Sequence, residues 1–231
     1  LGPMVQALKG ELPEEVLLGE NGVDYYAPLA EGQKTGWFYD HRAARRRILP
    51  LVAGARVLDV FSYCGAWGVL AAARGASSVT CVDSSARAME FVQRNAELNG
   101  VADRMTTLAM EANAAMKELI LQGQRFDVVI IDPPAFIKRK KDFKNGLAGY
   151  HAINELAMRL VEPGGILVSA SCSMHLSRDQ LMDVVRSSGR HIDRFVQVFA
   201  SEGQAEDHPI HPAIPETEYL KSIFARVLMN P

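Results

Sequence analysis

The sequence predicts an α/β fold in which an open, mostly parallel sheet follows a small β-rich segment. Short apolar runs bounded by glycine, proline or polar residues alternate with longer segments of helical composition. One apolar run, residues 57–60, leads into a turn that contains Gly65 and Gly68, and helical composition follows. A strand, a glycine turn and a helix in this order are typical of a loop that binds a nucleotide-like cofactor at the edge of such a sheet.

The composition limits the class of protein. A length of 231 residues suffices for one substantial α/β domain with a small appendage, and 48% hydrophobic with 23% charged residues is typical of a soluble globular protein. No membrane-spanning run or signal peptide is visible. Three widely spaced cysteines predict no disulfide framework and no metal site, and they favour a reducing, cytoplasmic compartment. The net charge of −2 does not by itself indicate a nucleic-acid binder, so local clusters of charge matter more.

Two apolar runs near the start, residues 16–18 and 23–28, flank an Asn21-Gly22 turn signal and predict a β-hairpin. Two strands alone are marginally stable, so we expect the hairpin to pack against something else. We therefore divide the chain into residues 1–40, the C-terminal part of a small β-rich domain, and residues 41–231, the main domain.

A basic segment follows. Residues 41–49 predict a helix that Pro50 ends, and this segment carries four arginines that cannot all face the core: Arg42, Arg45, Arg46 and Arg47. They form either a solvated basic face or a surface that contacts phosphates, and the sequence favours neither.

The glycine turn departs from two common nucleotide-binding patterns. Tyr63 stands where dinucleotide sites have the first glycine of Gly-x-Gly-x-x-Gly, and no Gly-Lys-Ser/Thr is present to hold a triphosphate. Asp59 places a carboxylate beside the loop, which repels phosphate but suits an ammonium group. S-adenosylmethionine has no phosphate, a sulfonium and an α-ammonium, and it fits better than NAD or ATP. Asp83 ends the next predicted strand, where such folds place a ribose-binding acid, and this favours a cofactor site over an ordinary turn that binds nothing.

The remaining elements follow in order. Strands are predicted at 78–82, 104–109, 125–131, 166–170, 195–200 and 222–229, and helices at 67–74, 84–99, 113–121, 150–161 and 176–188. The run 125–131 is nearly all apolar and therefore predicts a strand buried on both faces. Asn113, just after the third of the main-domain strands, either accepts a hydrogen bond from an adenine amine or caps a helix.

The segment after the buried strand predicts a base pocket. Asp132 is followed by Pro133 and Pro134, which fix the backbone at the sheet edge where open α/β sheets bind ligands. A rigid carboxylate near the flat side chain of Phe136 supplies an acceptor and a stacking face for a planar base. The alternative is a Pro-Pro turn in which Asp132 serves only as a helix cap.

A basic stretch and a cysteine complete the candidate site. Residues 137–144 carry Lys138, Arg139, Lys140, Lys141 and Lys144. They form either a mobile loop that closes over an RNA backbone or an ordinary solvated loop. Cys172 follows the next strand at the same edge, between two serines, and we expect it to face the crevice rather than to serve as a small buried apolar residue.

Together these motifs resemble the class I S-adenosylmethionine-dependent methyltransferases, and within them the bacterial large-subunit ribosomal RNA cytosine-C5 methyltransferase family. The motifs that carry the resemblance run from about residue 10 to the end in the family's order: 33–42, 58–65, 82–85, 132–136, 171–173, 207–209 and 219–221. The chain departs from the family at His41, Cys64, Asn113 and Ala135, where Gln, Thr, Asp and Lys are usual. Asp40-His41-Arg42 is closer to a related group that methylates guanine.

The resemblance implies a Rossmann-like, seven-stranded sheet with one antiparallel strand near the end, and ribosomal RNA as partner. It allows a homodimer, and it places the family's RNA-binding PUA domain outside this chain. The implied cofactor-binding residues are Lys34, Thr35, Phe38, Asp59, Phe61, Ser62, Tyr63, Gly65, Asp83, Ser84, Asn113 and Asp132. The implied substrate-binding residues are Arg42, Pro133, Pro134, Phe136, Lys138 and Arg139.

The resemblance also implies the chemistry. A thiolate adds to carbon 6 of cytosine so that carbon 5 can accept a methyl group, and Cys172 is the cysteine at the family's position, with Asp132 on the cytosine edge. Cys64 and Cys81 are poorer candidates, one in the cofactor loop and one within a buried strand. His208 and Asp207 are weaker candidates for removing the proton. The rival hypotheses are a guanine-nitrogen methyltransferase, which needs no nucleophile, and an RNA module that binds the cofactor without turnover.

Overall fold

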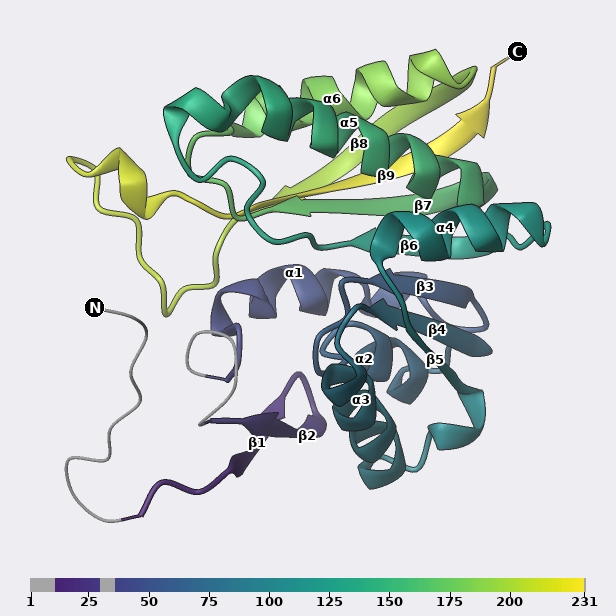
Figure 1. The fold of residues 1–231 in the computed structure, drawn as a ribbon, viewed down its shortest axis with the longest axis vertical. Helices are drawn as coiled ribbons and strands as arrows, with labels where there is room; N and C mark the ends of the chain where they lie inside the picture. Colours follow the sequence, from purple (N-terminus) through teal and green to yellow (C-terminus); the bar gives the residue numbers. More distant parts are fainter. Residues whose placement is uncertain (1–10, 30–35, 231) are drawn as a thin grey trace.

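The computed structural model describes residues 11–29 and 36–230, and within them a seven-stranded sheet forms the centre of the molecule (Figure 1). The strands lie in the order β5-β4-β3-β6-β7-β9-β8. Neighbours from β5 to β7 pair in parallel, whereas β9 is antiparallel to both β7 and β8. The predicted sheet with one antiparallel strand near the end is therefore confirmed.

The bounds of the sheet strands are β3 Arg56–Val60, β4 Ser78–Asp83, β5 Met105–Ala109, β6 Phe126–Ile131, β7 Val161–Ser171, β8 Arg194–Glu202 and β9 Lys221–Met229. The helices are α1 Arg42–Arg47, α2 Gly68–Ala73, α3 Ala86–Leu98, α4 Ala112–Leu121, α5 Phe143–Leu160 and α6 Arg178–His191. Short 3-10 turns lie at η1 Tyr39–His41, η2 Leu49–Leu51, η3 Ala102–Arg104, η4 Lys140–Asp142 and η5 Pro215–Thr217. No helix in the described part of the chain is long and apolar enough to cross a membrane.

Two apolar layers cover the sheet, because alternate residues of each strand point to opposite faces. Val57 packs with residues of α1, α2 and α3 on one face, and Leu58 packs with residues of α4, α5 and α6 on the other. The chain starts the sheet at β3, builds outward to β5 and then returns to β6 beside β3. The loops after β3 and β6 therefore diverge at the point where the strand order reverses, which is where ligands bind in such sheets.

The predicted hairpin is confirmed as β1 Glu15–Glu20 and β2 Val23–Pro28, and it packs on α3. Two side-chain amides, Asn95 of α3 and Asn99 at its C-terminal cap, pair with the backbone of β2. Asn95 accepts from the Tyr26 backbone N–H at 2.7 Å and donates to the Tyr26 carbonyl, and Asn99 makes the same pair of bonds with Asp24. Asn95 also donates to the Cys64 carbonyl, so the helix links the hairpin to the loop after β3. The division into residues 1–40 and 41–231 stays a prediction.

The structure corrects two element boundaries. Helix α5 begins at Phe143 rather than at residue 150, and it takes in part of the segment expected to be a basic loop. Gly146 and Gly149 weaken the helical pattern in the sequence, but they allow close packing. A Cβ at position 146 would overlap Ile137 and the backbone of Phe136, and one at position 149 would crowd the Phe136 ring. Strand β7 begins at Val161 rather than at the predicted residue 166. It passes through Pro163-Gly164-Gly165, with a register shift against β6.

The four arginines of 41–49 do not form one basic face. Arg45 is only 2% exposed, and its guanidinium donates to both carboxylate oxygens of Glu20, at 2.6 and 2.9 Å, and to the Phe38 carbonyl. The Trp37 indole donates to the same carboxylate. The other three arginines pair with acids at the end of β8 and just after it: Arg42 with Asp207 and Glu206, Arg46 with Glu206, and Arg47 with Glu202.

We predict that Arg45→Ala lowers the free energy of unfolding by about 3–5 kcal/mol, because it leaves the Glu20 carboxylate buried without its cation. Urea denaturation checks this. Arg46→Ala on the same helix, where the side chain is 61% exposed, is the matched control and should change stability by less than about 0.5 kcal/mol. Equal effects of the two substitutions would show that the buried pair does not anchor the hairpin.

Candidate functional site

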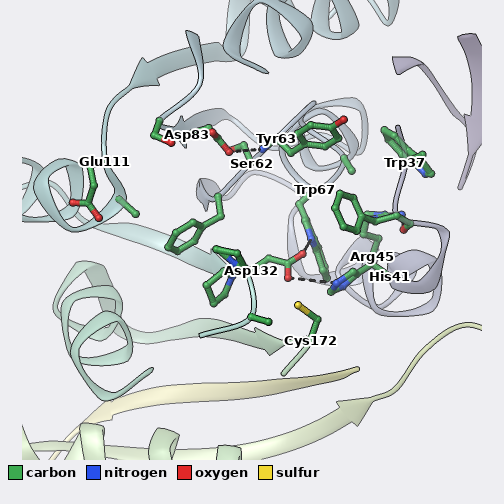
Figure 2. Close-up of a pocket in the computed structure, with 18 residues that line it drawn as sticks. Trp37, His41, Arg45, Ser62, Tyr63, Trp67, Asp83, Glu111, Asp132 and Cys172 are labelled. Atoms are coloured by element: carbon green, nitrogen blue, oxygen red, sulfur yellow. Dashed lines mark hydrogen bonds and ion pairs between the residues drawn. The ribbon is translucent and has the colours of Figure 1, made fainter. Parts of the chain in front are cut away.

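A cavity of about 570 Å³ opens at the carboxyl edge of the sheet (Figure 2). This volume is within the usual range for a small-molecule site. Residues from the ends of five strands and from the segment before β3 line it: Trp37, Phe38, His41, Arg45, Phe61, Ser62, Tyr63, Ala66, Trp67, Asp83, Ser84, Glu111, Ala112, Asp132, Pro133, Pro134, Ala135 and Cys172. Most of the residues predicted for the cofactor and for the base therefore share one cavity.

The loop after β3 is tightly held against the end of β4. The backbone N–H groups of Phe61 and Ser62 donate to the Val82 carbonyl, at 2.9 and 3.0 Å. The Ser62 hydroxyl donates to the Asp59 carbonyl and accepts from the Val82 N–H. Phe61 and Tyr63 have φ of 67° and 48°, in the left-handed region that non-glycine residues avoid. Such strain, at roughly 1 kcal/mol or more per residue, is typical of loops whose conformation serves a site.

Asp83 faces the cavity from the end of β4, as predicted (Figure 2). One carboxylate oxygen accepts from the Tyr63 N–H and the other from the Ser85 N–H, both at 3.0 Å. Because each oxygen can accept two hydrogen bonds, the carboxylate can hold the loop and still accept from the hydroxyls of a ribose.

Asp59 lies beneath the loop and is not among the residues that line the cavity. It is fully buried, and one oxygen accepts from the Gly68 N–H at 2.9 Å while the other has no hydrogen-bond partner in the described structure. Burial raises the pKa of Asp59 to about 7, and the charges of Asp132 and Asp83 act in the same direction. A Cβ at position 68 would overlap the Cys81 sulfur, so Gly68 is required here.

Asp132 is the centre of a polar cluster that the sequence did not reveal. The Trp67 indole N–H donates to one carboxylate oxygen at 3.0 Å, and His41 Nε2 lies 3.4 Å from the other (Figure 2). The two rings meet edge to face, with centroids 6.0 Å apart. The sequence predicted Trp67 only as the start of a helix and did not indicate that its side chain points toward Asp132. The one sequence feature that pointed to this cluster was His41, which stands where the resembled family usually has Gln.

Cys172 lines the cavity, while the serines on either side of it point into the protein. The Ser171 and Ser173 hydroxyls each lie 2.8 Å from the Tyr150 hydroxyl, and Ser173 also accepts from the Ile137 N–H. This buried network fixes the segment that presents Cys172. The other two cysteines are fully buried, and burial raises the pKa of both Cys64, to about 12, and Cys81.

Other predicted residues lie in different surroundings. Phe136 does not line the cavity, and its ring packs against Tyr150 with centroids 4.8 Å apart. Asn113 is beside the cavity rather than in its wall, and its amide donates to Glu111, the residue that caps α4. Gly65 adopts φ of 80° and is packed against Val69 and Val92. Lys34 and Thr35 lie outside the described residues.

Two further groups of predicted residues lie outside the cavity wall. Lys138 and Arg139 are exposed, and Arg139 pairs with Asp142. Asp207 and His208 bond to each other at 3.0 Å. Asp207 also pairs with Arg42, and none of these three residues lines the cavity.

Known proteins are similar to this chain in sequence and in fold. Ribosomal RNA large subunit methyltransferase I of Shewanella denitrificans is 37% identical over 98% of this chain, and that of Klebsiella pneumoniae is 35% identical over 98%. The chain spans 58% and 56% of the length of these relatives. Among solved structures, SMU.776, a methyltransferase complexed with SAH, matches with a TM-score of 0.85 at 24% identity, covering 95% of this chain and 58% of that one.

A second solved structure, the SAM-dependent methyltransferase from Agrobacterium tumefaciens, matches with a TM-score of 0.73 at 20% identity, over 96% of this chain and 72% of that one. At these identities the structural matches show the fold alone. The model of the S-adenosylmethionine-dependent methyltransferase family matches residues 3–221, nearly the whole chain. This match agrees with the glycine turn, which lacks a phosphate site, and with the acid that ends β4. The chain belongs to the S-adenosylmethionine-dependent methyltransferase family.

Proposed function

We propose that this chain is the catalytic part of an enzyme that methylates carbon 5 of a cytosine in large-subunit ribosomal RNA. The observation that carries the proposal is the shared cavity of Cys172 and Asp132, beside the loop after β3. The names of the curated relatives support ribosomal RNA as substrate, and the presence of a cysteine at this edge supports cytosine. From this substrate we infer a cytoplasmic location.

The residues present fit S-adenosylmethionine, which when bound supplies an activated methyl group on a sulfonium. Two carboxylates, Asp83 and Asp132, line the cavity and favour a ligand with positive charge. We assign the cofactor to the loop after β3 and to Phe38, Asp83 and Ser84, with Asn113, Lys34 and Thr35 as further contacts predicted from the sequence.

In the proposed reaction the Cys172 thiolate adds to carbon 6 of the cytosine. A carbon–sulfur bond forms there, and the electron pair of the 5,6 double bond makes carbon 5 a nucleophile. Carbon 5 takes the methyl group. A base then removes the proton from carbon 5, the double bond re-forms, and the thiolate leaves. Asp132 accepts from the amine of the cytosine edge, and Trp67 and His41 fix the orientation of its carboxylate. His208 and Asp207 lie outside the cavity wall, and their proposed role in removing the proton rests on the family motif alone.

One observation favours a second candidate function. His41 lies in the cavity against Asp132, and the Asp-His-Arg sequence at 40–42 resembles that of guanine-methylating relatives of the family. Methylation of a guanine nitrogen needs no thiolate, so the two candidates differ in what they require of Cys172.

We predict that Cys172→Ala reduces cytosine methylation by a factor of about 10³ or more, because no other described residue that lines the cavity carries a thiol to add to carbon 6. Cofactor binding, measured by calorimetry, should be unchanged. RNA that contains 5-fluorocytosine should form a covalent adduct with the wild-type protein and none with the variant, since fluorine cannot leave as the proton does. Cys81→Ala is the control and should retain the adduct. Near-normal turnover of Cys172→Ala would favour the guanine reaction.

We also propose that the RNA backbone lies along residues 138–144 rather than along α1. The side chains of Lys138, Lys140, Lys141 and Lys144 are exposed, whereas the exposed arginines of α1 face acids of the segment 202–207. Phosphate contacts need cations that are not already neutralised.

Replacing Lys138 and Lys140 by Ala should weaken RNA binding for all sequences and reduce the slope of log K against log salt by about one for each phosphate contact that is lost. Titrations at several salt concentrations measure the slope. Arg159→Ala/Arg190→Ala removes the same charge from the exposed far ends of α5 and α6, and it should leave the slope unchanged. Equal slopes for both double variants would contradict this assignment.

A further inference from the structure

Lys221 is a buried lysine beside the segment that carries Cys172. It is the first residue of β9 and pairs in register with Ser171, the last residue of β7. Its side chain is directed inward, and the residue is 4% exposed. The ammonium donates to the carbonyl of Ser173 at 2.6 Å and to the carbonyl of Tyr219 at 3.0 Å. The cation is therefore fixed to the backbone of the residue that follows Cys172.

Burying this ammonium costs free energy that a residue with only a structural role would not need to spend. Its two hydrogen-bond partners in the described structure are neutral carbonyls, and the nearby carboxylate of Glu218 pairs with Arg178 instead. Burying a cation without an anionic partner disfavours the charged form, and an apolar residue of similar size would fill the same space at lower cost. Burial accordingly lowers the pKa of Lys221 to about 8, while negative charge on Cys172 acts to raise it.

We propose that Lys221 is a positioning residue that stabilises the thiolate of Cys172 and so prepares it for attack. The proposal rests on the function proposed above, in which that thiolate is the nucleophile. The thiol proton passes to solvent through the cavity, and the lysine keeps all three of its own protons. A fixed cation close to a sulfur favours the anionic form by direct attraction.

Other charged and titratable groups surround the pair. The Asp132 carboxylate and His41 face Cys172 across the cavity, and the Tyr150 hydroxyl lies behind it with Ser171 and Ser173. The Tyr219 hydroxyl donates to Asp40 at 2.8 Å, and both burial and that carboxylate raise the pKa of Tyr219, which keeps the phenol neutral. The carboxylate of Asp132 disfavours a thiolate at Cys172, so a stabilising cation is needed if the thiol is to ionise near neutral pH.

The rate of alkylation by iodoacetamide, followed by mass spectrometry at pH 6 to 10 without RNA, tests this proposal. Cys64 and Cys81 are 0% exposed, so Cys172 is the cysteine that reacts in the folded protein, and Cys172→Ala gives the blank. For the wild-type protein we expect a midpoint below about 8.5, the value of an ordinary cysteine. In Lys221→Gln, which keeps a donor for the carbonyls but loses the charge, the midpoint should rise by about one unit. The rate at pH 7 should then fall about tenfold. Lys221→Arg should stay near the wild-type midpoint.

Two results would overturn the proposal. One is a wild-type midpoint at or above 8.5, which requires no variant to fold. The other is an unchanged midpoint in a Lys221→Gln protein that still binds S-adenosylmethionine with normal affinity. A midpoint that depends on Lys221 without an adduct on 5-fluorocytosine RNA would support the lysine–thiolate pair and contradict the proposed cytosine chemistry. The two failures are therefore distinguishable.

Discussion

The attachment of the loop after β3 to the end of β4 is the constraint on which the site depends. One carbonyl, that of Val82, accepts two backbone N–H groups of the loop, and the Asp83 carboxylate accepts a third. These bonds hold Phe61 and Tyr63 in left-handed conformations that the residues would not adopt alone. The loop therefore curves back over the sheet edge instead of continuing directly into α2, and this creates the wall of the cavity.

The same edge concentrates charge of both signs in a confined space. Asp83 beside the loop and Asp132 across the strand-order reversal line the cavity with carboxylates, which suits a cationic ligand and not a phosphate. On the opposite side, Lys221 brings a buried cation to the segment that presents Cys172. In the proposed mechanism this cation offsets the effect of the Asp132 carboxylate, which also faces Cys172.

The sequence predicted the parts of the structure that depend on local patterns. The apolar run that became β6, the acid at the end of β4 and the turn of the hairpin follow from residue type and spacing, and the structure confirms them. The predicted start of α5 was wrong because Gly146 and Gly149 lower the helix propensity of this segment. Both glycines serve close packing, which helix propensity does not take into account. The burial of Arg45 was missed because its partner Glu20 lies 25 residues away. The bond from Trp67 to Asp132 joins residues 65 apart, and only the assembled sheet brings them together.

The identity of the methylated nucleoside tests the central claim most directly. The protein that carries this chain is incubated with unmodified large-subunit ribosomal RNA and S-adenosylmethionine, and the RNA is digested to nucleosides for mass spectrometry. The arrangement of Cys172, Asp132 and Lys221 predicts 5-methylcytidine as the product. Methylguanosine without 5-methylcytidine would contradict the account.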